Sequence, residues 1–225
     1  MITIKNLSKK FGSKSVLNGI DLSFEKGKVY GVVGKNGAGK TTLFNCIAGV
    51  ERYTGDIDSE YDVLKNHIGI LETNPVFLSR ITGWEYLKLH CIARGIGTDN
   101  FEDQNIFELP LGAYAATYST GMKKKLALMA ILLQKNDVYI LDEPFNGVDI
   151  QSNILISAII DELKIKGKTV IISSHIFSTL SDTCDAIFLM KDGLISKTAT
   201  KEQYAELEDE MKTDIVGDGI SRLVL

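Results

Sequence analysis

The sequence has few of the residues that mark secreted or metal-stapled proteins. Its 225 residues include only three cysteines, Cys46, Cys91 and Cys184, and no CxxC or Cys/His cluster. An odd number of cysteines at unrelated spacings provides neither a disulfide framework nor a zinc site. We therefore expect buried, reduced thiols and a cytoplasmic protein.

Long apolar segments are missing as well. The longest apolar run, residues 126–133, is much shorter than the roughly 20 residues needed to cross a bilayer. Residues 1–12 lack the apolar core of a signal peptide. We expect no direct membrane insertion, so any role at a membrane would require a partner.

The chain also lacks an excess of basic residues. It has 25 lysines and arginines against 29 aspartates and glutamates, which gives a formal net charge of −4. Binding to nucleic acid without sequence preference needs a basic face, so no nucleic-acid partner is expected. The length fits one large domain, with or without an inserted subdomain.

Strand-like and helix-like segments alternate along the chain. Compact apolar runs predict buried strands, and segments with helical periodicity follow them. This alternation predicts an α/β fold with a mostly parallel sheet. Strands are expected within 1–12, 15–34, 55–71, 137–144, 168–175 and 185–200, with turns at Gly12, Gly27 and Asp192-Gly193, and helices within 40–50, 82–95, 122–134 and 152–167.

Residues 34–41, GKNGAGKT, match the phosphate-loop pattern G-x-x-x-x-G-K-[ST] in full, between a predicted strand and a predicted helix. The glycines allow backbone N–H groups to curve around phosphate oxygens. Lys40 would place its charge on the β and γ phosphates, and Thr41 would offer a hydroxyl to Mg²⁺. The expected ATP-binding residues here are Gly34, Asn36, Gly37, Ala38, Gly39, Lys40, Thr41 and Thr42.

Two adjacent acids, Asp142 and Glu143, end the apolar strand that begins at Val138. Burying two carboxylates is costly unless a charged partner is present, and a metal ion with a water molecule would supply one. Asp142 would orient Mg²⁺, and Glu143 would act as general base on the attacking water. A strand that ends at the surface with solvated acids is the alternative.

His175 follows another apolar strand. Ligands of open α/β sheets gather at the carboxyl ends of the strands, so His175 is expected beside the phosphate loop and Asp142. We interpret it as a catalytic contact to the γ-phosphate, with a structural histidine as the alternative.

With these motifs, residues 1–200 resemble the nucleotide-binding subunit of an ATP-binding cassette (ABC) transporter. The resemblance also rests on YSTGM at 118–122, which matches the family signature, and on NGVD at 146–149. It implies a P-loop NTPase core with a mostly parallel sheet, an N-terminal antiparallel β subdomain and a short inserted helical subdomain. It further implies a cytoplasmic ATPase that uses ATP and Mg²⁺ and is peripheral on the cytoplasmic face of the membrane.

The family pairs two cassettes head to tail, and each ATP lies between one subunit's phosphate loop and the other's signature. The resemblance therefore implies a homodimer in which the partner's ATP is contacted by Ser119, Thr120, Gly121 and Met122. A helix N-terminus favours an anion, which suits this role. An ordinary N-cap at Ser119 is the alternative, although it leaves Gly121 unexplained.

Other residues take roles by resemblance alone. Asp149 would lie at the dimer seam and couple the two sites. Phe11 matches the family's aromatic residue that stacks on adenine, usually a tyrosine, and stacking needs only a ring face. A buried core phenylalanine is the alternative. The lysines at 123–125 are expected to form mainly a solvated face.

The chain departs from the family at one metal position. The family has a glutamine after a strand like residues 67–71, where it contacts Mg²⁺ and relays movement to the membrane partner. Alignment on this strand and on Pro75 places Thr73 there, beside Glu72. Thr73 still offers an oxygen and Glu72 is an alternative ligand, so we expect slower or differently coupled hydrolysis. The expected metal ligands are Thr41, Asp142 and Thr73.

The resemblance implies a single ABC ATPase domain over 1–225, with a helical subdomain inserted at about 75–117 and an acidic tail at about 201–225. The insertion is several residues shorter than usual. Its Trp84 and Tyr86 could meet a membrane subunit or lie in the core, and the sequence leaves both open. The tail is expected to hold a helix and a small strand.

These features imply a subunit that dimerises on MgATP and drives a separate transmembrane permease, with hydrolysis and release reopening the dimer. The signature and its lysine-rich continuation resemble bacterial exporters of drugs, peptides or antibiotics. Two rivals stay open: a non-transport ABC ATPase acting on a soluble scaffold, and a nucleotide-gated binding module with little turnover. The sequence does not identify the substrate.

Overall fold

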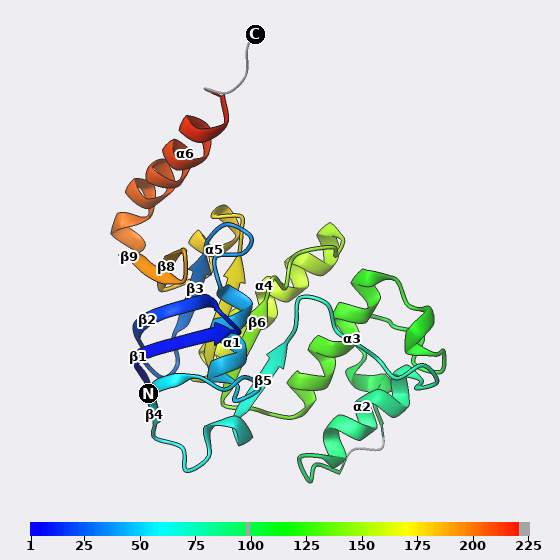
Figure 1. Ribbon diagram of the computed structural model, residues 1–225. Coiled ribbons are helices and arrows are strands. Elements are labelled where there is room, and N and C mark those ends of the chain that lie inside the picture. Colours follow the sequence, from blue (N-terminus) through cyan, green and yellow to red (C-terminus); the bar gives the residue numbers. More distant parts are fainter. Residues whose placement is uncertain (98–99, 221–225) are drawn as a thin grey trace.

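The computed structural model describes residues 1–97 and 100–220, and its strands form two sheets (Figure 1). The smaller sheet is antiparallel, in the order β2-β1-β4, and consists of β1 (Ile2–Phe11), β2 (Lys14–Phe24) and β4 (Thr54–Ser59). β1 and β2 form a hairpin with the predicted turn at Gly12, whose φ is 59°. Glycine adopts this left-handed backbone at no steric cost.

The larger sheet has the strand order β5-β6-β7-β3-β8-β9. β5, β6, β7, β3 and β8 are parallel, and β9 pairs antiparallel with β8 across the predicted turn at Asp192-Gly193. The bounds are β3 (Val29–Val33), β5 (Ile68–Leu71), β6 (Val138–Asp142), β7 (Thr169–Ser174), β8 (Ala186–Lys191) and β9 (Leu194–Thr200). The predicted α/β fold, with a mostly parallel sheet and antiparallel N-terminal strands, is confirmed.

The α-helices of the described ranges are α1 (Lys40–Ile47), α2 (Gly83–Ile92), α3 (Thr120–Leu133), α4 (Ile150–Ile165), α5 (Ser178–Ser181) and α6 (Tyr204–Ile220). Short 3-10 helices lie at Leu64–Asn66, Glu102–Gln104, Ala115–Thr117 and Lys201–Gln203. The second and third of these lie within residues 75–117, where the helical insertion was predicted.

β6 is buried along its whole length because both faces of the larger sheet are covered. Val138 and Ile140 belong to a core cluster with α1 and the small sheet. Tyr139 and Leu141 belong to the opposite cluster, with α3 and α4. This alternation fixes which way each strand residue points, and it delivers Asp142 to the carboxyl end of the sheet.

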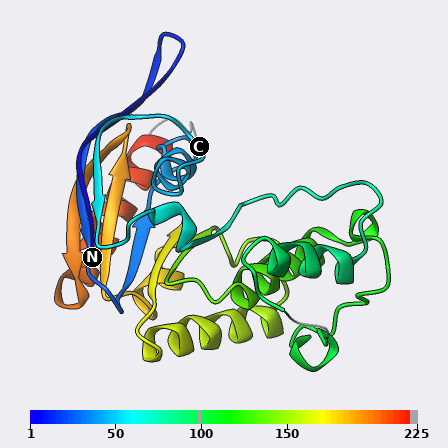
Figure 2. The same cartoon turned by 90° about the horizontal axis from the view of Figure 1, so that it is seen from below.

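α2 and α3 lie to one side of the two sheets (Figures 1 and 2). Trp84 of α2 packs edge-on against Phe101, with ring centroids 5.7 Å apart, and Tyr86 packs on Phe77 at 4.6 Å. Both α2 side chains are half-buried against the core. Of the two alternatives for Trp84 and Tyr86, packing in the core therefore explains much of the buried surface of each ring.

α6 projects away from the sheets (Figure 1) and is anchored at its start. Tyr204 and Leu207 are buried, and the Tyr204 hydroxyl donates to the Cys184 carbonyl at 3.0 Å. The helix predicted for the tail is confirmed, whereas the small strand predicted at its end falls on 221–225, outside the described residues. The division into one domain with an insertion and a tail stays a prediction.

The three cysteines are free and buried, as predicted. Burial raises the pKa of the Cys46 thiol to about 11, and a protonated thiol is a poor nucleophile and a poor metal ligand. Within 1–97 and 100–220, no helix has both the length and the apolar character needed to span a bilayer.

Candidate active site

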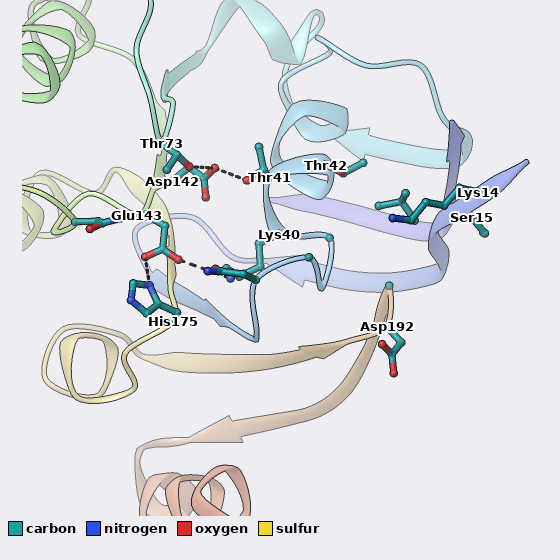
Figure 3. A pocket seen from close by; sticks show the side chains of 16 residues that line it. Lys14, Ser15, Lys40, Thr41, Thr42, Thr73, Asp142, Glu143, His175 and Asp192 are labelled. Carbon is teal, nitrogen blue, oxygen red and sulfur yellow. Dashed lines mark hydrogen bonds and ion pairs between the residues drawn. The ribbon is translucent and has the colours of Figure 1, made fainter. Parts of the chain in front are cut away.

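A cavity of about 710 Å³ lies where the phosphate loop meets the carboxyl ends of β6 and β7 (Figure 3). It brings together most of the ATP-binding, catalytic and metal-binding residues that the sequence predicted for one nucleotide. The lining residues are Lys14, Ser15, Val16, Asn36, Gly37, Gly39, Lys40, Thr41, Thr42, Thr73, Asp142, Glu143, Asn146, His175, Asp192 and Gly193.

The phosphate loop needs glycine at its last turn before α1. Gly39 has φ 111°, and a Cβ there would lie 2.8 Å from Cε of Met190 and 3.0 Å from Cδ2 of Leu17. Gly34 and Ala38, also predicted to bind ATP, line a second cavity of about 370 Å³ instead of this one. Their backbone still shapes the loop, because the Gly34 carbonyl accepts a hydrogen bond from Lys40 at 2.7 Å.

Lys40 is held inside the loop, only 7% exposed. Besides its bond to Gly34, its Nζ lies 3.7 Å from Oε1 of Glu143. An ammonium group so placed can exchange these partners for phosphate oxygens, which form strong charge-assisted hydrogen bonds. The loop therefore holds the Lys40 ammonium at the cavity.

Asp142 is the most heavily bonded acid of the site. Its Oδ2 accepts hydrogen bonds from the hydroxyls of Thr41 and Thr73, each at 2.6 Å, and its Oδ1 accepts one from Ser173. Asp142 is 2% exposed and Glu143 8%. The alternative of solvated acids at the strand end is therefore wrong, and the Asp142 carboxylate is fixed in orientation by three hydroxyls.

This donor set fits Mg²⁺. The ion takes hard oxygen ligands and is usually held by one or two carboxylates together with substrate phosphates and water. Thr41, Thr73 and Asp142 supply such oxygens at one point of the cavity. Glu72, the alternative ligand, is exposed and lines a smaller neighbouring cavity. In the described part of the chain, no three His, Cys, Asp or Glu side chains gather into a metal site.

Glu143 lies between two potential cations. Its Oε1 faces Lys40, and its Oε2 lies 2.9 Å from Nδ1 of His175 (Figure 3). Its backbone is left-handed, with φ 51°, which costs a non-glycine residue about 1–3 kcal/mol. The Glu143 N–H donates to Oγ of Ser173 at 2.9 Å, which helps to hold this conformation. The carboxylate thus faces the cavity beside the phosphate loop.

The predicted signature residues do not line this cavity. Ser119 caps α3, and its Oγ accepts from the Met122 N–H at 3.2 Å, so the N-cap interpretation is correct as a local description. Gly121 has a reason within its own chain, because a Cβ there would lie 2.8 Å from the Gly147 carbonyl oxygen. Ser119 and Thr120 are exposed. Because residues 119–122 do not line the cavity, a nucleotide bound at the N-terminus of α3 would be a second nucleotide, separate from the one in the cavity.

The prediction of a solvated face for the three lysines of α3 was wrong for Lys124, which is 1% exposed. Its Nζ donates to the carbonyls of Glu143 and Asn146, each at 2.7 Å. Burial lowers the pKa of Lys124, while the carboxylates of Glu143 and Asp142 oppose that shift. Helical periodicity could not reveal this, because the acceptors belong to a loop about 20 residues later.

Asp149 caps α4. Its Oδ1 accepts from the Ser152 N–H at 2.9 Å, and its Oδ2 lies 3.2 Å from Nζ of Lys125. The hydrogen bonds from Ser152, followed by that from Lys125, hold the pKa of Asp149 well below its usual range. Its place at a dimer seam stays a prediction.

Phe11 is 48% exposed and does not line the cavity, so the alternative of a buried core residue is wrong. The ammonium of Lys9 lies 4.6 Å from the centroid of its ring. A cation at this distance lies within the range of a cation–π contact. Stacking on adenine remains a prediction.

One wall of the cavity consists of residues that were not predicted from the sequence. Its residues come from the β1–β2 hairpin, from the β8–β9 turn and from the loop after β6: Lys14, Ser15, Val16, Asp192, Gly193 and Asn146. Asn18 joins the first two segments, because its side chain donates to the Asp192 carbonyl at 2.9 Å. The turn at Asp192-Gly193 was predicted, but no local motif signals a contact over such a sequence distance.

Residues 17–146 match the sequence model of a protein family described as ABC transporter. This range covers more than half of the chain and includes the phosphate loop and both acids. The chain belongs to the ABC transporter family. Membership identifies it as an ATP-binding subunit and an ATPase of that family.

Individual ABC transporter proteins are similar over most of their length. The bacitracin transport ATP-binding protein of Enterococcus faecalis is 30% identical over 100% of this chain and 78% of that protein. The lantibiotic transport ATP-binding protein of Streptococcus pyogenes is 29% identical over 96% of this chain and 98% of that protein.

A solved structure confirms the fold. It is a dimeric, post-hydrolysis state of an ATP-binding cassette bound to ADP and Pi, with a TM-score of 0.79. It is 21% identical in sequence and covers 89% of this chain and 99% of that chain.

Proposed function

We propose that this ATPase binds MgATP in the cavity, pairs with a second copy of itself and drives a separate transmembrane permease. The observation that carries the proposal is the convergence of Lys40, Glu143 and His175 on one cavity, where the Glu143 carboxylate contacts both of the other side chains. A phosphate-binding cation, a buried carboxylate and an imidazole in this order suit hydrolysis of a terminal phosphate.

The predicted ATP-binding and catalytic residues then divide the work between them. Lys40 binds the β and γ phosphates, and Glu143 accepts a proton from the attacking water. His175 orients the Glu143 carboxylate through its Nδ1 and contacts the γ-phosphate. Phe11 stacks on adenine. The remaining phosphate-loop residues contact phosphate or ribose through backbone and hydroxyl groups: Gly34, Asn36, Gly37, Ala38, Gly39 and Thr42.

Mg²⁺ is proposed to be held by Thr41, Asp142 and Thr73. The ion would screen the phosphate charge and lower the barrier to attack on the γ-phosphate. Asp142 is already oriented by the two threonine hydroxyls on its Oδ2. Thr73 stands where the family has a longer glutamine, so turnover is expected to be slow for an ABC ATPase.

The homodimer is proposed because the N-terminus of α3 lies outside the cavity and its first residues are exposed. In a head-to-tail dimer it would contact the ATP of the partner through Ser119, Thr120, Gly121 and Met122. Asp149 would lie near the seam. The dimeric cassette with ADP and Pi is a structural precedent for such pairing.

Export is the proposed direction, because two relatives are named for bacitracin and lantibiotic transport. The chain would then act from the cytoplasmic face of the membrane, as a peripheral subunit. Its cargo would contact the membrane chain, so a peptide-like substrate is proposed only by analogy with those relatives.

Co-purification tests this function. The chain would be tagged in its native cell, membranes solubilised in mild detergent, and bound proteins identified. We expect a multi-span membrane protein in stoichiometric amount. A soluble partner, or recovery of the chain alone from the soluble fraction, would contradict the transport role and favour a non-transport ABC ATPase on a soluble scaffold.

A further inference from the structure

The loop that follows β6 is attached to α3 through a buried amine. Nζ of Lys124 donates to the carbonyls of Glu143 and Asn146, both at 2.7 Å. Lys124 lies one helical turn after the start of α3 at Thr120, and its side chain is removed from solvent. A buried ammonium is costly, so such a residue needs several good acceptors, and this loop supplies two.

Lys124 acts on the backbone of the residue proposed as general base. The left-handed conformation of Glu143 is held at its N–H by Ser173. Its carbonyl accepts from Lys124 at 2.7 Å and from the Asn146 N–H at 3.2 Å. Removing the amine would leave the longer of these two bonds, and a strained backbone relaxes when its supports are lost.

The next lysine fixes the far end of the same loop. Nζ of Lys125 donates to Oδ2 of Asp149 at 3.2 Å and to Oγ of Ser152 at 3.0 Å. Between these ends, Gly121 of α3 packs closely on the Gly147 carbonyl. The whole loop from Glu143 to Asp149 therefore moves with α3 or breaks these contacts.

We infer that Lys124 is a positioning residue of the ATPase reaction, which keeps the Glu143 carboxylate between Lys40 and His175. The inference rests on the proposed role of Glu143 as general base. Residues 119–122, which are proposed to contact the partner's ATP, lie at the N-terminus of α3. The Lys124 amine therefore connects this helix end to Glu143, the proposed general base for the ATP bound in the chain's own cavity.

The purified chain allows a direct test. Steady-state kcat and KM for ATP, and the Kd of a fluorescent ATP analogue, would be measured for Lys124→Met, which keeps most of the apolar stem but removes the amine and both of its hydrogen bonds. We expect kcat to fall by about 10- to 100-fold, because misplacing a catalytic group by about 1 Å has effects of this size. The Kd should stay within about twofold, since the phosphate loop is untouched. Lys123→Met, one residue away on α3, is the matched control and should leave both unchanged.

A second readout separates positioning from general loss of structure. If Lys124 acts only through Glu143, adding Lys124→Met to Glu143→Gln should lower the residual turnover no further. If Lys124→Met does not fold, Lys124→Gln replaces it. Its amide is one bond shorter, so it reaches both carbonyls only if the loop moves, and it should lower kcat with an unchanged Kd.

Wild-type kcat in the folded Lys124 variant would overturn the inference, as would a loss of kcat matched by an equal loss of nucleotide affinity. A further fall of turnover in the double variant would also contradict it. Wild-type turnover in Glu143→Gln alone would instead refute the proposed general base, so the two failures are distinguishable.

Discussion

The hydroxyl of Thr73 should set the response of the enzyme to Mg²⁺. It donates to Oδ2 of Asp142 at 2.6 Å, the same oxygen that accepts from Thr41. A hydrogen bond to a charged group contributes about 1.5–3 kcal/mol. Because Thr41 and Ser173 would still hold the carboxylate, we take the lower end, about 1.5 kcal/mol, which corresponds to roughly a tenfold change in an equilibrium constant.

Thr73→Val keeps the shape of the side chain and removes the hydroxyl. The free Mg²⁺ concentration for half-maximal ATPase activity, measured at saturating ATP, should rise about tenfold. Thr73→Gln, which restores the residue of the family at this position, should raise kcat. Thr54→Val is a control, because Thr54 is exposed on β4, does not line the cavity, and donates its hydroxyl to the Ser8 carbonyl at 3.4 Å. An unchanged Mg²⁺ requirement in Thr73→Val would refute the assignment of Thr73 to the metal site.

Two further predictions concern stability. A hydrogen bond from Lys168, and to a lesser extent one from His67, lowers the pKa of Asp137. The Asp137 carboxylate therefore stabilises the fold above its unfolded pKa of about 4, and this stabilisation is lost as pH falls through the folded pKa. Asp137→Asn should therefore lower Tm at pH 7, with a deficit that shrinks between about pH 5 and pH 2; a constant deficit would contradict this. Gly121→Ala places a Cβ 2.8 Å from the Gly147 carbonyl oxygen and should lower the free energy of unfolding by about 1–3 kcal/mol. Each kcal/mol corresponds to a fall in Tm of about 2–4 °C, which calorimetry would measure. An unchanged Tm would show that α3 and the loop adjust freely.

The parts of the site that the sequence predicted are those with local motifs. The phosphate loop has a fixed pattern between a strand and a helix, and Asp142 and Glu143 directly follow an apolar run. Because β3, β6 and β7 are parallel neighbours, their carboxyl ends meet, and the structure places Lys40, Glu143 and His175 together as expected. Thr73, placed by alignment alone, bonds to Asp142.

The parts that could not be predicted depend on contacts between distant segments. Lys124 looks like one of three solvated lysines until the Glu143 and Asn146 carbonyls are placed beside it. The cavity wall formed by the β1–β2 hairpin and the turn at Asp192 depends on a hydrogen bond from Asn18 to the Asp192 carbonyl, between segments 174 residues apart in the sequence. Gly121 fits a family signature, yet packing against Gly147 within one chain also requires it.

Two copies of this chain are proposed to enclose ATP between the phosphate loop of one and the α3 terminus of the other. The most direct test is light scattering of Glu143→Gln at saturating MgATP, with Ser119→Arg added in a second variant. We predict a dimer that forms only with ATP in the first variant, and a monomer that still binds ATP in the second, since Ser119 does not line the cavity. A monomeric Glu143→Gln at saturating MgATP, or a dimer that tolerates Ser119→Arg, would contradict the proposed dimer.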